Sequence, residues 1–346
     1  MSAPALDAVP FDRHRLTDYL RTNLPGFSGE VAFSRFQGGQ SNPTFRLDTP
    51  AASYVLRKKP SGHLIPGAHA VEREYRLMAA LAGLVPVPRM LLLCEDPEVI
   101  GQSFYLMEHV AGRIFRDARM LDAPKPERHG LCLELAEVLG RLHRVDHRAA
   151  GLADFGKAEG YVARQLARWS KQYAQSRFED NTAMDRLVPW LEANAPDDHR
   201  VAIVHGDYRT HNVIYASSAP RIAAVLDWEL ATIGHPVADL AYCLLPYHMP
   251  PDDPRGFGTE TAEALAIPSE AEMLTAYCRA AGKAEIPNWR FFLVFALFRS
   301  AAIRAGVYRR ALDGTAVNPA ALAMGELYRS TADCAWRLTQ GNPANE

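Results

Sequence analysis

The stretch HGDYRTHN (residues 205–212) connects two apolar runs, VAIV (201–204) and NVIYA (212–216), that are typical of short buried strands. It places Asp207 five residues before Asn212, and Asp227 follows fifteen residues later, at the end of the strand-like run IAAVLDWE. Because these positions lie at the ends of neighbouring strands, we expect the three oxygen-bearing side chains to converge at one edge.

Such a convergence has a chemical interpretation. Oxygen ligands suit Mg²⁺, which completes its shell with phosphate oxygens and water, so Asn212 and Asp227 are candidate metal ligands. Asp207 is then the candidate catalytic base, and the pattern H-x-D-x-x-x-x-N followed by D is typical of a kinase-like catalytic loop. We assign His205 to the catalytic group as a residue that orients the loop by hydrogen bonding. Two alternatives remain open at this point, plain turn residues and a transition-metal site that combines His205 and His211 with Asp207.

Composition narrows the protein class. The chain has 346 residues, 48% of them hydrophobic, with a formal net charge of −2, which indicates a globular protein with no overall electrostatic footprint for nucleic acid or a membrane surface. Neither a signal peptide nor a membrane span is expected, since the run FFLVFALF (291–298) is too short to cross a bilayer and predicts a buried helix. Five cysteines without a C-x-x-C pair argue against a disulfide framework or a zinc knuckle. We expect a cytoplasmic protein; its oligomeric state is open.

The pattern of the chain changes near residue 110. Residues 1–110 alternate short strand-like runs with turns around one helical stretch, whereas residues 111–346 are mostly helical in period apart from residues 201–227. This predicts an α+β fold with a small antiparallel-sheet N-lobe and a larger helical C-lobe.

The small lobe contains a glycine-rich turn, FQGGQSNPTFRL (36–47). Bare backbone and small side chains there can approach phosphate oxygens, although a plain hairpin turn is an alternative and no Walker sequence follows. The candidate phosphate-covering residues are Gly38, Gly39, Ser41 and Asn42.

A cation and a buried acid follow this turn. In SYVLRKK (53–59), Arg57 shares a strand face with Val55 and Lys59. In HAVEREYRLMAAL (69–81), Glu74 falls inside the apolar stripe of a helix, where an unpaired carboxylate would be costly. We therefore expect Arg57 to pair with Glu74, the alternative being a Glu74 at the rim of the lobe.

Taken together, HGDYRTHN, LDWE, GHPVADLAY, GGQSNPTF, YVLRKKP and EREYRLMAAL resemble the aminoglycoside phosphotransferase family of small-molecule kinases, and within it the branch that includes kinase-like domains fused to some acyl-CoA dehydrogenases. The resemblance spans roughly Gly38 to Tyr308. It implies a bilobal protein-kinase-like fold and transfer of the γ-phosphoryl group of ATP, with GTP as the alternative, to a hydroxyl.

The resemblance also implies individual roles. Asp207 would be the base, Asn212 and Asp227 would bind Mg²⁺, and Asp239 would brace the catalytic loop. Arg57 would contact the α- and β-phosphates, although kinases generally use lysine there, so Lys58 or Lys59 is an alternative. Phosphate cover would come from Gly39, Ser41 and Asn42, and the adenine would bind hinge backbone at Glu108 to Val110.

The acceptor is inferred from charge. The segment beginning at Tyr161 carries Arg164 and Arg168 four residues apart, and Arg299 emerges from the apolar run near residue 298. These candidate acceptor residues favour an anionic small molecule such as a hydroxyacyl-CoA over a cationic aminoglycoside. Solvated arginines, an antibiotic kinase and a nucleotide-binding pseudokinase that acts as an interaction module stay as alternatives.

Overall fold

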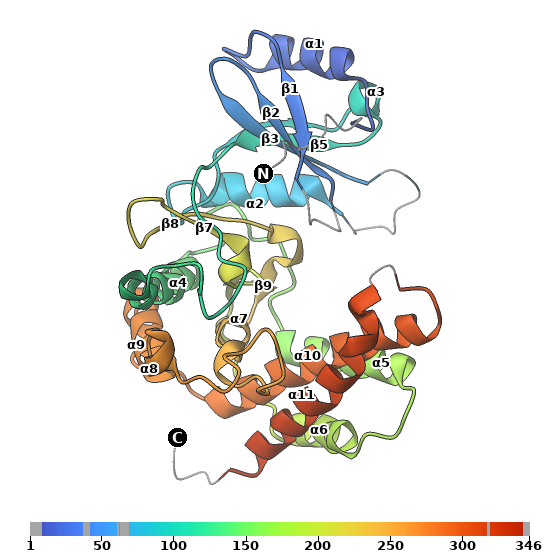
Figure 1. Cartoon of the computed structure of the whole chain (residues 1–346), viewed down its shortest axis with the longest axis vertical. Coiled ribbons are helices and arrows are strands. Elements are labelled where there is room, and N and C mark those ends of the chain that lie inside the picture. Colours follow the sequence, from blue (N-terminus) through green and yellow to red (C-terminus); the bar gives the residue numbers. More distant parts are fainter. Residues whose placement is uncertain (1–8, 37–41, 61, 63–68, 317–318, 342–346) are drawn as a thin grey trace.

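The computed structural model describes residues 9–36, 42–60, 62, 69–316 and 319–341, arranged in two lobes (Figure 1). The N-lobe is built on a five-stranded antiparallel sheet with the strand order β1-β2-β3-β5-β4. Its strands are β1 (Ala32–Arg35), β2 (Thr44–Asp48), β3 (Ser53–Lys58), β4 (Met90–Cys94) and β5 (Phe104–Glu108).

The two faces of this sheet are covered by different helices. Leu56 of β3 packs with the residues of α1 (Arg13–Asn23) and α3 (Pro97–Ile100), while its neighbour Val55 packs with α2 (Val71–Leu81). Successive strand side chains point to opposite faces, which is why adjacent residues of β3 enter separate cores. The helix α2 lies between the sheet and the C-lobe (Figure 1), so its polar side chains are placed at the lobe boundary.

The C-lobe is mainly helical and has two apolar cores. One core forms around α4 and α9, and the other around α5, α6, α10 and α11. The helices are α4 (Lys125–Arg144), α5 (Tyr161–Ser176), α6 (Thr182–Ala193), α7 (Pro236–Cys243), α8 (Ala262–Leu265), α9 (Glu270–Ala281), α10 (Trp289–Leu312) and α11 (Met324–Thr339), with short 3₁₀ helices η1 (Thr210–Asn212), η2 (Trp228–Leu230), η3 (Leu245–Tyr247) and η4 (Pro319–Ala323).

The helix α10 is the one described helix long and apolar enough to cross a membrane, by length and composition alone. Within the protein, 78% of its apolar window is buried between the other C-lobe helices. The expected buried helix is thus present.

Two short antiparallel strand pairs interrupt the helices. They are β6 (Ala202–Val204) with β9 (Thr232–Gly234) and β7 (Val213–Tyr215) with β8 (Ile222–Val225). The segment 205–212 therefore connects β6 to β7, and Asp227 follows β8. The pairing of β7 with β8 places Asn212, at the end of the segment 205–212, next to the segment that ends at Asp227.

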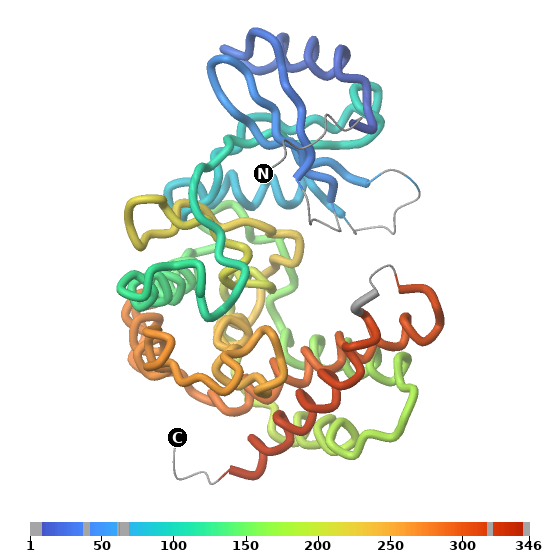
Figure 2. Tube along the Cα trace, viewed as in Figure 1, coloured from blue at the N-terminus to red at the C-terminus, as the bar shows by residue number. Residues whose placement is uncertain are grey.

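The connection between the lobes follows β5, where the chain passes directly from the sheet to the helical lobe (Figure 2). Arg113 forms an isolated antiparallel bridge with Tyr215 of β7. At Gly112 an added Cβ would lie 2.3 Å from the carbonyl oxygen of Tyr215, so only glycine allows this close approach. The predicted α+β fold, with an antiparallel-sheet lobe and a helical lobe, is confirmed.

Candidate active site

The carboxylate of Asp207 is held at both oxygens. Its Oδ2 accepts a hydrogen bond of 2.8 Å from Asn212 Nδ2 and lies 3.2 Å from Arg209 Nη2, and its Oδ1 accepts a bond of 2.7 Å from the hydroxyl of Tyr242. These contacts fix the orientation of the carboxylate before any ligand binds. Sequence reasoning identified Asp207 and Asn212 but missed Arg209 and Tyr242. Arg209 could have been found from its position inside HGDYRTHN. The available signal for Tyr242 was its position three residues after Asp239.

Asp239 braces the catalytic loop, as expected. Its carboxylate accepts hydrogen bonds from the backbone N–H groups of His205 (2.7 Å) and Gly206 (2.9 Å), and it lies 3.3 Å from His143 Nε2. Burial by itself raises the pKa of Asp239, but His143 and His205 outweigh burial and hold it below its ordinary value. Asp239 is thus a charged anchor for the turn that precedes Asp207.

His205 is fully buried and does not face the cleft. Its Nε2 lies 2.8 Å from the carbonyl oxygen of Leu226, and its Nδ1 accepts a bond of 3.2 Å from the backbone N–H of Asp207. The neutral tautomer with the proton on Nε2 satisfies both contacts. His205 therefore links the loop to the segment before Asp227, in the orienting role predicted for it, and it is not a proton-transfer group.

Asn212 and Asp227 come together as predicted for metal ligands. The backbone N–H of Leu226 donates to the carbonyl oxygen of Asn212 at 2.7 Å, which ties the two segments. Because the amide nitrogen of Asn212 faces Asp207, its Oδ1 remains available to a cation. Asp227 adopts a left-handed backbone conformation (φ 63°, ψ 59°), which is uncommon for a non-glycine residue and turns its carboxylate into the cleft.

These two residues fit a cation that brings its own additional ligands. Within the described ranges, no three His, Cys, Asp or Glu side chains gather in a group that could hold a metal. An open pair of one carboxylate and one amide oxygen suits Mg²⁺ bound together with phosphates rather than a closed protein cage.

Arg57 is the cation of the cleft. Its Nε lies 3.1 Å from Glu74 Oε2, the predicted ion pair, and its Nη2 lies 3.0 Å from Asp227 Oδ1. Burial alone lowers the pKa of Arg57, but Glu74 and Asp227 raise it above its ordinary value, so the guanidinium stays charged. Lys58 is buried with 1% of its surface exposed, Lys59 pairs with Glu72, and neither lines the cavity that Arg57 lines, which favours Arg57 over both alternatives.

Only part of the glycine-rich turn is described, because Gly38, Gly39 and Ser41 lie outside the described residues. For Asn42 the structure corrects the expectation. Its side chain is buried and donates a hydrogen bond of 2.9 Å to Glu74 Oε1, so it anchors the turn to α2 and does not face the phosphates. The reason is that Arg57 and Tyr105 both contact Oε2 of the buried Glu74, so its Oε1 needs a donor of its own.

A cavity of about 610 Å³ lies between the lobes. It is lined by Arg57, by Asn212 and Asp227, and by the predicted hinge residues Glu108 and Val110. The carboxylate of Glu108 accepts a hydrogen bond from the backbone N–H of Arg89 at 2.9 Å, so its side chain is committed to the sheet. A cofactor would therefore meet the hinge through the backbone.

None of the four candidate acceptor residues lines this cavity, and of their described contacts only that of Arg299 is with the catalytic loop. Arg299 Nη2 donates to the carbonyl oxygen of Gly206 at 2.8 Å, and its guanidinium lies 4.7 Å from the ring of Tyr242. Burial raises the pKa of Tyr161 to about 12. Arg164 donates to the carbonyl oxygen of Lys157, and Arg168 lies 5.0 Å from the ring of Trp169. Their role in acceptor binding stays a prediction.

Comparison with known proteins connects this geometry to a family. The sequence profile described as "Phosphotransferase enzyme family" matches residues 32–292. Acyl-CoA dehydrogenase family member 10 of Mus musculus is 43% identical over 333 residues, 95% of this chain and 31% of that protein. Acyl-CoA dehydrogenase family member 11 of Homo sapiens is 38% identical over 345 residues, 98% of this chain and 44% of that protein. The chain thus spans less than half the length of these relatives.

Solved structures show the same fold. A protein of Ralstonia eutropha assigned to the aminoglycoside phosphotransferases superposes with a TM-score of 0.87 at 42% identity, over 95% of this chain and 98% of its own. A spectinomycin phosphotransferase solved with ADP and spectinomycin superposes with a TM-score of 0.64 at 13% identity, over 96% of this chain and 100% of its own. The two lobes and the cleft between them are therefore those of kinase-like phosphotransferases.

Proposed function

Because the chain belongs to the phosphotransferase enzyme family, we propose that it transfers the γ-phosphoryl group of ATP to a hydroxyl of an anionic small molecule such as a hydroxyacyl-CoA. The observation that carries this proposal is the convergence of Asp207, Asn212 and Asp227 at the edge of the cleft that also contains Arg57. Each has the chemistry that phosphoryl transfer needs, and none needs to move far to act.

The cleft suits a nucleotide. Its volume of about 610 Å³ lies within the usual range of small-molecule sites, and its lining passes from apolar Val55 and Met107 near the hinge to Arg57 and Asp227. The adenine would therefore sit against the hinge and the phosphates against Arg57. A spectinomycin phosphotransferase of the same fold was solved with ADP, which supports a nucleotide as a ligand of this fold.

The metal ligands of this chain would be Asp227 and the Oδ1 of Asn212. A bound Mg²⁺ would supply charge neutralisation on the phosphates. Arg57 lies 3.0 Å from the same Asp227 carboxylate, so it is placed to hold phosphate oxygens beside the cation site.

Asp207 orients the acceptor and takes its proton. The acceptor hydroxyl oxygen forms a bond to the γ-phosphorus while the bond from that phosphorus to the β–γ bridging oxygen breaks. The hydroxyl proton passes to a carboxylate oxygen of Asp207, and the products are ADP and a phosphate monoester. Tyr242 and Asn212 keep the carboxylate in place through its other contacts.

Two observations support an anionic, CoA-linked acceptor. Arg209 and Arg116 lie on the C-lobe side of the catalytic loop, where they line a second cavity, and Arg116 forms no ion pair with any described carboxylate. The relatives are named as acyl-CoA dehydrogenase family members, which supports an acyl-CoA as the carrier of the hydroxyl.

The test is a nucleotide-binding and turnover experiment. We expect ATP to raise the melting temperature only with Mg²⁺, and we expect Asp227→Ala to lose that rise. In a coupled ADP-release assay with a panel of hydroxyacyl-CoAs, Asp207→Asn should lower kcat by at least about a thousandfold while ATP still binds. The control is Asp122→Asn, at an exposed aspartate that lines neither the cleft nor the second cavity. Full turnover by Asp207→Asn would reject the mechanism, and a folded wild-type protein that binds no nucleotide would reject the function.

A further inference from the structure

A second cavity, of about 310 Å³, lies beside the catalytic loop in the C-lobe. Its walls come from α4, η1, the end of α7, η3, the segment of residues 249–257 and α9, so segments far apart in the sequence enclose it. Most of the side chains that line it are apolar, among them Leu135, Met249, Phe257, Ile267 and Met273.

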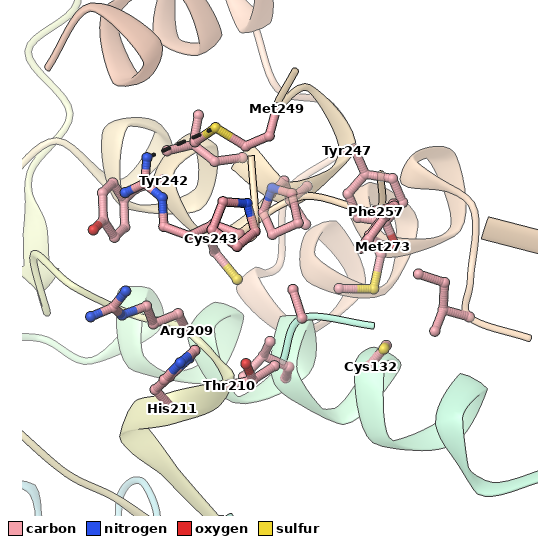
Figure 3. A pocket seen from close by; sticks show the side chains of 18 of the residues that line it. Cys132, Arg209, Thr210, His211, Tyr242, Cys243, Tyr247, Met249, Phe257 and Met273 are labelled. Carbon is pink, nitrogen blue, oxygen red and sulfur yellow. Dashed lines mark hydrogen bonds between the residues drawn. The ribbon is translucent and has the colours of Figure 1, made fainter. Parts of the chain in front are cut away.

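The cavity has a polar end and an apolar end. Figure 3 shows Arg209, His211 and Tyr242 gathered on one side, whereas Phe257 and Met273 lie on the other. None of the residues that line it is an aspartate or glutamate. The cavity therefore matches an amphiphile, with a polar or anionic group at one end and an apolar chain at the other.

The polar end lies one side chain away from the candidate base. Asp207 lines neither cavity, but Tyr242 and Arg209 line this one and contact it: Tyr242 donates a hydrogen bond of 2.7 Å to Asp207 Oδ1, and Arg209 Nη2 lies 3.2 Å from Asp207 Oδ2. His211 lines both this cavity and the cleft between the lobes. The polar end of a molecule in the cavity would therefore meet the cluster of side chains that holds Asp207.

One wall of the cavity is fixed by buried charge. Asp253, which is 2% exposed, accepts a hydrogen bond from Arg304 of α10, and Arg255 donates to Ser300 of the same helix. These contacts hold the segment 249–257 against α10, so the cavity is formed before a ligand arrives.

We propose that this cavity binds the apolar chain of the acceptor, with the hydroxyl of that acceptor at Asp207, and that its depth selects chain length. The inference rests on the proposed function and adds to it the place where the chain of the acceptor binds and the feature that limits its length. A volume of 310 Å³ holds on the order of ten heavy atoms, taking roughly 30 Å³ for each. A polycationic, polyhydroxylated sugar would leave its polar groups without partners beside Phe257 and Met273.

The experiment measures binding without relying on catalysis. Straight-chain carboxylates from butanoate to tetradecanoate are titrated by calorimetry into the full chain with ADP and Mg²⁺. Affinity should rise about fourfold per methylene and stop rising near octanoate, whose ten heavy atoms fill the cavity. Equal affinity for all chain lengths would overturn the inference.

Variants at Met273 test the location. Met273→Ala should move the preferred length to longer chains, and Met273→Trp to shorter ones, because they deepen and shorten the apolar end. Phe257→Ala, at a partly buried position, is the second variant if a Met273 variant does not fold. The control is Met184→Ala, at a fully buried methionine of α6 outside the cavity, which should keep the wild-type length preference. An unchanged preference in both cavity positions would overturn the inference.

Phosphoryl transfer to the hydroxylated forms of the same carboxylates and of their CoA thioesters is measured in parallel. Length-dependent binding without transfer would reject the proposed function and keep the cavity as a chain-binding site. Transfer with the same kcat/KM at every length would keep the function and reject the cavity as the selector.

Discussion

Replacement of Arg57 by methionine should expose how the buried acid of α2 is held. Glu74 is 2% exposed, and Arg57 Nε lies 3.1 Å from its Oε2. Removal of one partner of a buried ion pair costs about 3–5 kcal/mol because the other charge is left uncompensated. We therefore expect Arg57→Met to lower the free energy of unfolding by about that amount at pH 7.

The loss of unfolding free energy in Arg57→Met should depend on pH, in a direction set by the pKa of Glu74. Burial already raises the pKa of Glu74 above its ordinary value of 4.5, and loss of the Arg57 charge raises it further. A carboxyl group with a raised pKa in the folded state binds more protons there than in the unfolded state. The stability of Arg57→Met therefore falls as the pH rises from 4.5 toward the folded-state pKa, by up to about 1.4 kcal/mol per pH unit.

The assay is urea unfolding at pH 5 and pH 7 of the wild type, Arg57→Met, Glu74→Gln and the double variant. A glutamine at position 74 can accept the hydrogen bond of Asn42 at its carbonyl oxygen and donate from its amide to the hydroxyl of Tyr105, and it carries no charge, so the double variant should be more stable than Arg57→Met at pH 7. A double variant no more stable than Arg57→Met, together with a deficit that is the same at both pH values, would refute the reasoning.

Three further perturbations have defined outcomes. Gly112→Ala should lower stability by about 1–3 kcal/mol, since its Cβ would lie 2.3 Å from the Tyr215 carbonyl oxygen; an unchanged melting temperature would contradict this close approach. Tyr242→Phe removes a hydrogen bond of 2.7 Å to the charged Asp207 and should lower kcat by about tenfold in the ADP-release assay with little change in the KM for ATP. Burial lowers the pKa of His235 from 6.5 to about 4, so its folded state resists protonation and stability should fall as the pH drops through that interval. His235→Phe should lack this loss, which urea unfolding across the interval would measure, and identical pH dependence of both proteins would exclude His235 as its source.

Local pattern was enough to predict the fold class and much of the candidate site. The spacing of Asp207, Asn212 and Asp227 placed them at adjoining strand ends, and the structure brings them together through short contacts. Helical periodicity placed Glu74 in an apolar stripe and so predicted its ion pair with Arg57. These inferences succeeded because residues on one helix face or at neighbouring strand ends have neighbours set by backbone geometry.

Packing between distant segments decided the rest. Sequence favoured Arg57 but left Lys58 and Lys59 as alternatives, because the choice depends on which face of β3 meets the cleft, and the helices packed on each face determine that. It placed Asn42 at the phosphates, whereas the buried carboxylate of Glu74 holds it. Tyr242 reaches Asp207 only because α7 packs behind the catalytic loop.

The cavity beside the catalytic loop is the clearest case of a feature that depends on packing between distant segments. Its walls come from separate segments between residues 116 and 273, and no local pattern in any of them indicates a hollow. The sequence by itself determined the main candidates for the chemistry, since residue types and spacing are local properties. Only the tertiary structure decided which side chains line the cleft, which line the second cavity and which are buried as supports, because those directions follow from contacts between elements that the chain brings together only on folding.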